Sequence, residues 1–377
     1  MDIVKLKTAL IIVGTRPEVI KMAPIIAQLK AHKGWNARVC FTGQHEDLGA
    51  QMLDWWGIEP DARCSIMEEH QGLNRLLAKA LTSIDRVLEE QNPDVVLVQG
   101  DTTSCLAGAM AAFQRKIPVA HVEAGLRTQN KYAPFPEEMN RRLVSRLADI
   151  HFAPTEHNKQ ALVSEGVSKD HIFVTGNSVI DALYMCLDRI DEQNNPEIQQ
   201  LLGRLQPEKK TLLVTAHRRE NISRGLSELS DALLDLVASY DLQVILPIHP
   251  NPEVKAALEG PLGGSEHIHL TESLGYESFV WMMNHCDILL SDSGGVQEDA
   301  PSLHKPVLVM REETERVEAV EAGTVALIGM KADAIRSSVS ELLNNEAAYQ
   351  AMSNRTNPYG DGEAAKKMIP ILERFLA

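Results

Sequence analysis

The sequence has few features of a secreted or disulfide-linked protein. Its five cysteines, Cys40, Cys64, Cys105, Cys186 and Cys286, show no CxxC spacing and no pairing pattern. Most of them lie in apolar runs, so we expect buried free thiols in a protein of the reducing cytoplasm. The chain also lacks low-complexity segments and short-period repeats. We therefore expect ordinary globular domains.

The chain has no apolar run long enough to cross a bilayer. The N-terminal run is short and enters a loop at Gly14, whereas a membrane helix needs about 20 apolar residues. Because this run lacks a small-residue cleavage site, we expect a first β-strand and not a signal peptide. We expect no membrane partner.

Positive charge is also scarce. Lysine and arginine number 37 against 52 aspartates and glutamates, which gives a formal net charge of −15. Nucleic acid is not an expected partner, because binding to its phosphates needs a basic surface. An acidic protein can still bind a small anion where Arg, Lys and His cluster locally. The 377 residues suffice for two domains with full cores.

The order of apolar segments predicts the fold class. Buried-strand patterns alternate with amphipathic helices in two series, separated by a polar region at residues 184–210. The expected strands are residues 8–13, 37–42, 94–98, 118–122, 150–153 and 172–174, then 211–215, 243–247, 268–270, 287–291 and 306–310. This alternation predicts an α/β protein with two Rossmann-like, doubly wound domains facing a central cleft. We place the first domain at residues 1–180 and the second at residues 181–362.

Carboxylates follow two neighbouring strands of the first domain. Asp101 comes after the apolar run 94–98, Glu123 closes the run 118–122, and Glu137 and Glu138 follow Pro136. Strand C-termini of a parallel sheet face one ligand-binding crevice, so these acids should converge. Other readings stay open for some of them. Asp101 could be the N-cap of a helix beginning at residue 102. Glu137 and Glu138 could complement a helix dipole, with Pro136 in the first helical position.

The second domain contains a candidate phosphate site. Ser293, Gly294 and Gly295 lie between a buried strand and a helix expected to start near Val296. Small residues let backbone N–H groups approach an anion at a helix N-terminus, although a plain tight turn is the alternative. Arg16, His217 and Arg316 also follow strands or helix starts on the predicted ligand edge, and together these elements predict a diphosphate site.

Other cofactor sites are not expected. The sequence around Ser293 matches neither GxGxxG nor the P-loop, which argues against NAD and ATP chemistry. His249, His267 and His269 lie near one another in sequence, but no further ligand with suitable spacing accompanies them, so we expect no metal site.

Taken together, the motifs resemble those of the non-hydrolysing UDP-N-acetylglucosamine 2-epimerases. The resemblance covers essentially the whole chain in the family's order. It is carried by GTRPEVIK at 14–21, GDTT at 100–103, HVEAGLR at 121–127, PEE at 136–138, GN at 176–177, HRRE at 217–220, DSGG at 292–295, TER at 314–316 and NPYGDG at 357–362. It implies a GT-B-like fold whose final helix, residues 363–377, packs back on the first domain. It also implies a cytoplasmic homodimer that needs no metal and no NAD.

The resemblance further implies reversible C2 epimerisation of UDP-GlcNAc to UDP-ManNAc. The family eliminates UDP, passes through 2-acetamidoglucal, and adds UDP back with a proton on the opposite face of C2. Acid and base groups are then needed on both faces of the sugar, and cations around the diphosphate. By matching, the catalytic set is Asp101, Glu123, Glu137 and His217. The matched substrate and UDP ligands are Arg16, Lys21, Arg141, His217, Phe279, Ser293, Gly294, Gly295, Asp299 and Arg316.

Several positions depart from the family pattern. Asp299 stands where a glutamate usually grips the ribose, which leaves Asp299 and Glu298 as alternatives for that contact. In members activated by a second UDP-GlcNAc, the segment of Gln44 and His45 and the region of Gln71 contribute. Asp47 and His70 replace the glutamine and arginine found there in activated members, so allosteric activation stays open. Separately, Val317 replaces the proline that usually follows TER in the family.

Two other functions stay open beside epimerisation. A GT-B glycosyltransferase would need an acceptor cleft and no obligatory trio of acids. A catalytically silent UDP-sugar sensor would bind the nucleotide sugar without turnover. Retention of Asp101, Glu123 and Glu137 favours the epimerase, whose product would feed bacterial surface polysaccharide or glycoconjugate synthesis.

Overall fold

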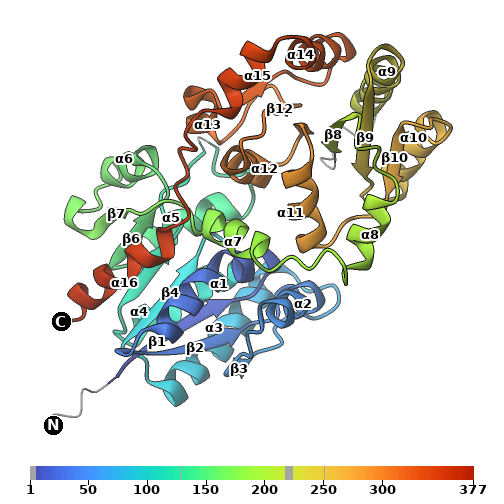
Figure 1. The fold of residues 1–377 in the computed structure, drawn as a ribbon. Coiled ribbons are helices and arrows are strands. Elements are labelled where there is room, and N and C mark those ends of the chain that lie inside the picture. The colour runs from blue at the N-terminus through green and yellow to red at the C-terminus, as the bar shows by residue number, and fades with distance from the viewer. Residues whose placement is uncertain (1–5, 129, 217–223, 250) are drawn as a thin grey trace. The chain divides into compact units, whose positions relative to one another are not determined.

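A computed structural model describes residues 6–128, 130–216, 224–249 and 251–377. The chain divides into two compact units (Figure 1). Unit 1 comprises residues 1–182 together with 359–377, and unit 2 comprises residues 183–358. The last helix, α16 (Ala364–Phe375), therefore belongs to the same unit as the N-terminal strands, where it packs against α1 (Arg16–Ala31).

Unit 1 is built on a seven-stranded parallel sheet with the order β3-β2-β1-β4-β5-β6-β7. Its strands are β1 (Lys7–Val13), β2 (Trp35–Phe41), β3 (Ala62–Arg63), β4 (Val95–Gln99), β5 (Val119–Val122), β6 (Ile150–Ala153) and β7 (Ile172–Val174). The central strands are continuous apolar runs because helices cover both faces of such a sheet.

The other helices of unit 1 alternate with these strands, as expected. They are α2 (Glu46–Trp56), α3 (Leu73–Gln91), α4 (Thr103–Gln114), α5 (Glu137–Leu147), α6 (Glu156–Ser164) and α7 (Ser178–Leu187), which runs across the unit boundary, with a 3₁₀ turn η1 (Lys169–His171). Leu76, Ala80, Ile84 and Val87 of α3 pack into a core that includes Leu10 on β1. Their spacing of three and four residues defines the buried face of this amphipathic helix.

Unit 2 repeats this design with a six-stranded parallel sheet in the order β10-β9-β8-β11-β12-β13. Its strands are β8 (Lys210–Thr215), β9 (Leu242–Pro247), β10 (Ile268–Thr271), β11 (Ile288–Ser291), β12 (Val307–Val309) and β13 (Val325–Leu327). Its helices are α8 (Pro196–Leu202), α9 (Arg224–Ser239), α10 (Pro252–Leu262), α11 (Tyr276–His285), α12 (Gly294–Asp299), η3 (Ala300–Leu303), α13 (Val317–Ala322), α14 (Ala332–Asn344) and α15 (Glu346–Ser353). The predicted α/β class is confirmed, and both strand orders are those of doubly wound, Rossmann-like sheets.

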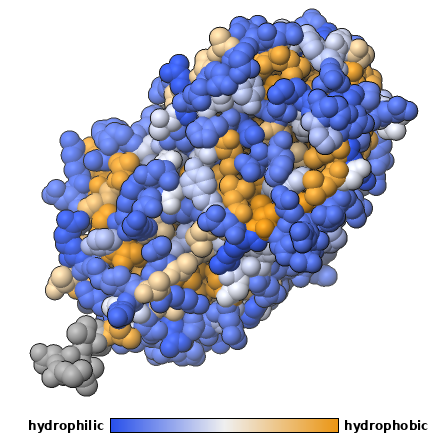
Figure 2. All heavy atoms as spheres, viewed as in Figure 1, coloured by the Kyte–Doolittle hydropathy of each residue, from blue (hydrophilic) through white to orange (hydrophobic). Residues whose placement is uncertain are grey.

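Most of the surface in view is hydrophilic, with several smaller hydrophobic areas between the hydrophilic ones (Figure 2). Within the described ranges, no helix is both long and apolar enough to span a membrane.

The strand order reverses at one place in each sheet, between β1 and β4 in unit 1 and between β8 and β11 in unit 2. Ligands of open α/β sheets bind outside the C-terminal ends of the strands at this switch point. In unit 1 those ends lead into Gly14 and Gly100, and in unit 2 β11 leads into Asp292. These turns carry the residues of the candidate site.

Candidate active site

The first turn of unit 1 presents Arg16 and Lys21 from α1. Thr15 is the N-cap of this helix and forms a capping box with Glu18. The capping box supplies acceptors for backbone N–H groups that have no partner within the first turn of a helix. Arg16 begins the helix and is half-exposed. Lys21, one turn further on, extends its ammonium group to Glu123 at the end of β5.

Glu123 is a carboxylate held by several donors. The Lys21 Nζ atom lies 2.6 and 2.7 Å from its two oxygens, and the Asn177 Nδ2 atom lies 3.2 Å from Oε1. The Gln99 amide donates to Oε2. Glu123 has a backbone φ of 60°, a left-handed conformation that non-glycine residues adopt mainly at turns and functional sites. Its side chain is 8% exposed, so the ion pair with Lys21 is shielded from water.

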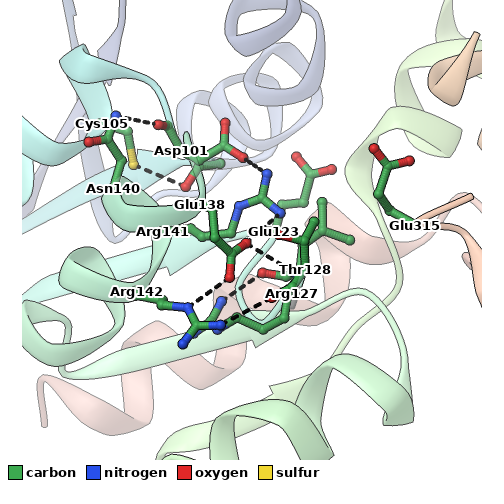
Figure 3. A network of polar contacts seen from close by, with 12 residues as sticks. Asp101, Cys105, Glu123, Arg127, Thr128, Glu138, Asn140, Arg141, Arg142 and Glu315 are labelled. Atoms are coloured by element: carbon green, nitrogen blue, oxygen red, sulfur yellow. Dashed lines mark hydrogen bonds and ion pairs between the residues drawn. The ribbon is translucent and has the colours of Figure 1, made fainter. Parts of the chain in front are cut away.

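Asp101 faces this pair from the turn after β4. The Arg141 Nη2 atom of α5 lies 2.5 Å from its Oδ2 atom (Figure 3), and Asn140 donates to its backbone carbonyl at 2.9 Å. Burial raises the pKa of Asp101, and the nearby Glu123 raises it further, while the Arg141 guanidinium opposes the rise. Asp101 therefore holds a proton more tightly than an ordinary aspartate does.

Capping does not explain Asp101. The N-cap of α4 is Thr102, whose hydroxyl accepts from the Cys105 N–H at 3.0 Å, so the capping interpretation of Asp101 is wrong. The sequence rule failed by one residue, because both Asp101 and Thr102 are good N-cap residues and only the backbone geometry distinguishes them.

The acids at the start of α5 have separate environments. Pro136 is the N-cap and Glu137 the first helical residue, so the expectation that Pro136 occupies the first helical position is wrong. Glu137 is half-exposed. Glu138 is fully buried and bound to the Arg142 Nε atom at 2.7 Å and the Thr128 N–H at 3.0 Å (Figure 3). Glu138 thus ties α5 to the preceding segment.

The residues matched to a second ligand site lie on three segments of unit 1. Gln44 accepts from the Ser104 N–H at 3.0 Å and from its hydroxyl at 2.8 Å, at the start of α4. His45 is the exposed N-cap residue of α2, and burial of its ring lowers its pKa. Gln71 accepts from the Glu68 N–H at 2.9 Å, in the loop before α3.

In unit 2 the candidate phosphate turn begins a short helix. Ser293 is the N-cap of α12, which starts at Gly294 and not near Val296 as expected. A Cβ atom on Gly294 would lie 3.3 Å from the Arg316 Cζ atom. The guanidinium group therefore packs directly against this turn, a close approach that the missing side chain permits. The structure brings Ser293, Gly294, Gly295 and Arg316 together.

Arg316 is fixed by carboxylates of its own unit. Its Nε and Nη2 atoms lie 2.8 and 2.7 Å from Glu298 Oε1, and Glu298 is only 2% exposed. Burial raises the pKa of Glu315, but backbone hydrogen bonding, Arg316 and Arg311 outweigh it and lower the value to about 2. Asp299 follows Glu298 at the end of α12 and is half-buried, as is Phe279 on α11. His217 lies outside the described residues.

The sequence interpretation missed several polar contacts of the site. Gln99 and Asn177 contact Glu123, and the Glu18 carboxylate accepts from the Thr102 hydroxyl beside Asp101 at 2.7 Å. A polar side chain at the end of an apolar strand is the signal that could have indicated Gln99. Among the described residues, no group of three or more His, Cys, Asp or Glu side chains is arranged to hold a metal ion.

These features define an α/β protein with two Rossmann-like units, one carrying clustered carboxylates and the other a glycine-containing turn packed against Arg316. Comparison with known proteins then gives the family. Residues 27–373 match the family model described as UDP-N-acetylglucosamine 2-epimerase. The chain belongs to this family, whose members are isomerases, and the resemblance inferred from its motifs is confirmed.

Named relatives cover nearly the whole chain. The UDP-N-acetylglucosamine 2-epimerase of Escherichia coli K12 is 46% identical over 367 residues, 97% of this chain and 98% of that protein. The crystal structure of the Neisseria meningitidis enzyme bound to UDP-GlcNAc has a TM-score of 0.88 and 43% identity, covering 97% of this chain and all of that one. The Methanocaldococcus jannaschii enzyme in complex with UDP-GlcNAc and UDP has a TM-score of 0.78 and 32% identity, covering 98% and 100%.

Proposed function

We propose that this protein interconverts UDP-GlcNAc and UDP-ManNAc by reversible, non-hydrolysing epimerisation at C2. The observation that carries the proposal is the pair Asp101 and Glu123, two carboxylates at adjacent strand ends with Arg141 and Lys21 as their respective cations. Relatives at 43% and 32% identity were solved with UDP-GlcNAc bound, which supports the choice of substrate.

The C2 hydrogen of the sugar is not next to a carbonyl group, so direct removal as a proton is unfavourable. Anti elimination avoids this difficulty: the C2–H bond and the C1–O bond to UDP break, a C1–C2 double bond forms, and 2-acetamidoglucal and UDP result. Re-addition of UDP to C1, with a proton delivered to the other face of C2, gives the epimer. The protein consequently needs one proton acceptor and one proton donor on opposite faces of the ring.

The two carboxylates suit different parts of this cycle. Lys21 and the amides favour the ionised form of Glu123. Asp101, whose pKa burial raises, can bind and release a proton nearer neutral pH. We assign the two proton transfers to Asp101 and Glu123, with Glu137 as the third acid of the matched set.

The leaving diphosphate requires positive charge that is already in place. We assign this role to Arg16, His217, Arg316 and the turn of residues 293–295, with Phe279 near the uracil. Lys21 and Arg141 support the carboxylates on the sugar side. For the ribose hydroxyls we favour Asp299, because Glu298 is buried against Arg316. Activation by a second UDP-GlcNAc near Gln44, His45 and Gln71 stays open.

We further propose a cytoplasmic homodimer that supplies UDP-ManNAc for surface polysaccharide or glycoconjugate synthesis. Unit 1 exposes large apolar side chains on α5 and just before it: Tyr132 is 67%, Phe135 61%, Leu143 43% and Met139 38% exposed. Met139 and Leu143 lie one helical turn apart, so they share a face. Light scattering after gel filtration tests this, and a monomeric wild type at micromolar concentration would contradict it.

The decisive experiment is incubation with UDP-GlcNAc in D₂O, followed by NMR. For the wild-type protein we expect deuterium at C2 and accumulation of both epimers. The Asp101→Asn variant should lose about 10²-fold or more in the rate of exchange. The exposed control Asp188→Asn should exchange at the wild-type rate. Absence of C2 exchange in folded wild-type protein would refute the proposal. Tight binding without exchange would indicate a sensor, and sugar transfer to an acceptor a glycosyltransferase.

A further inference from the structure

Two uncharged amides contact the carboxylate of Glu123, and neither takes part directly in the proton transfers assigned above. Gln99 is the last residue of β4 and is buried, and Asn177 follows β7 and is also buried. Each presents an amide N–H to a different Glu123 oxygen, Gln99 to Oε2 and Asn177 to Oε1. Lys21 spans both oxygens. Buried amides that face a buried carboxylate stabilise its charged form.

The sheet register places Gln99 beside Glu123. Gln99 pairs with Val122 across β4 and β5, so Glu123 is the next residue along the neighbouring strand. The Gly100 N–H donates to the Val122 carbonyl at 3.0 Å and continues this pairing. The pairing of β4 with β5 therefore positions the Gln99 side chain beside Glu123.

One side-chain contact and one backbone contact orient Asn177. Its Oδ1 atom accepts from the Val179 N–H at 3.2 Å, which requires the amide NH₂ group to face Glu123. Its own N–H donates to the Tyr359 carbonyl at 2.7 Å. A Cβ atom on the preceding Gly176 (φ 89°) would lie 3.1 Å from that carbonyl, so the returning C-terminal segment packs tightly against this turn.

Glu123 needs such support, because its φ of 60° costs a non-glycine residue free energy unless the surroundings hold it. Other charged or titratable groups also act on it. Lys21 reaches it from α1, and Asp101 acts on it from the turn after β4. Cys105 acts on it from α4 and His121 from β5. The two amides differ from all of these because their donor capacity does not change with pH.

We propose that Gln99 and Asn177 are positioning residues that hold Glu123 ionised and correctly oriented for proton transfer. This inference rests on the proposed epimerase function. Both residues act through Glu123. An amide replaced by the carboxylate of the same shape exchanges a donor for a negative charge, and a like charge at this distance disfavours ionisation of Glu123.

The test compares Asn177→Asp and Gln99→Glu with the wild-type protein. We expect the acid limb of the profile of kcat/KM against pH, measured by C2 exchange from UDP-GlcNAc, to move by about one pH unit or more toward higher pH. Binding of UDP alone, measured by calorimetry, should stay unchanged. The matched control is Asn158→Asp, in the same unit, where Oδ1 caps α6 by accepting from Thr155. It should leave the profile in place.

Circular dichroism first shows whether each variant folds. If the carboxylate variants do not fold, Asn177→Ser and Gln99→Met remove the donors without adding charge. These should lower kcat by about tenfold or more with little change in KM. Folded variants with a wild-type profile, or donor-free variants with a wild-type kcat, would overturn the inference. Failure of the proposed function is separate, because it appears as absence of C2 exchange in the wild-type protein.

Discussion

Replacing Glu18 with glutamine should remove a pH dependence from the stability of unit 1. Glu18 is 1% exposed and accepts from the Gly14 N–H at 3.0 Å, from the Thr15 N–H and hydroxyl at 2.8 Å each, and from the Thr102 hydroxyl at 2.7 Å. Burial raises its pKa from 4.5 to about 7, although these hydrogen bonds oppose the rise. The folded protein therefore holds a proton on Glu18 more tightly than the unfolded chain does.

The sign follows from this difference in pKa. The contribution of Glu18 to stability is fully present below about pH 4.5 and is lost as the pH rises through about 7. The difference between 4.5 and about 7 corresponds to about 3 kcal/mol in total. About 2 kcal/mol of this loss falls between about pH 5.5 and about pH 8. The glutamine side chain of the Glu18→Gln variant does not titrate, so the variant should not show this loss.

Urea unfolding at several pH values, followed by circular dichroism, measures the effect. All other groups titrate in both proteins, so the stability of Glu18→Gln minus that of the wild type isolates this residue. We expect that difference in stability to rise by about 2 kcal/mol from about pH 5.5 to about pH 8. The altered hydrogen bonds of the glutamine add a term that is the same at every pH, so they do not change this rise. A difference that is flat, or that falls with pH, would refute the reasoning.

Two further substitutions test the packing of each unit. Gly125→Ala would place a Cβ atom 2.3 Å from the Asn158 carbonyl oxygen at a φ of 97°, so we expect a loss of about 3 kcal/mol or more. An unchanged urea midpoint would contradict that estimate. Arg316→Ala removes a cation from the buried Glu298, which should cost about 3–5 kcal/mol and weaken UDP binding in calorimetry. The half-exposed Arg336→Ala is its control and should cost less than about 1 kcal/mol, and equal losses in the two variants would contradict the burial argument.

Long periodic segments of the fold could be predicted from the sequence. The apolar face of α3 predicts residues 73–91, which agree with the observed Leu73–Gln91. The strand β3 has only two residues, too few for a period of two to be recognised, and the three-residue strand β13 was not expected either. Helix α10 carries the usual signals of a helix start, because Asn251 caps it and Pro252 opens it.

The candidate site was predictable where it follows from strand ends. Asp101 and Glu123 come together because parallel strands end at one edge of the sheet. The amides of Gln99 and Asn177 were not singled out, because an isolated amide near a strand end has many harmless explanations. Their significance depends on the partner, Glu123, which lies 24 and 54 residues away along the chain.

The adjacent residues Asp101 and Thr102 have different roles at the start of α4. Thr102 supplies the oxygen that caps α4, so the Asp101 carboxylate is not required for the helix start. It projects instead to Arg141 on a neighbouring helix. A capping carboxylate would accept hydrogen bonds from backbone N–H groups, and these bonds lower its pKa. Because Thr102 takes that role, no capping bonds oppose the rise that burial causes in the pKa of Asp101, which suits the proton transfer that we propose for this residue.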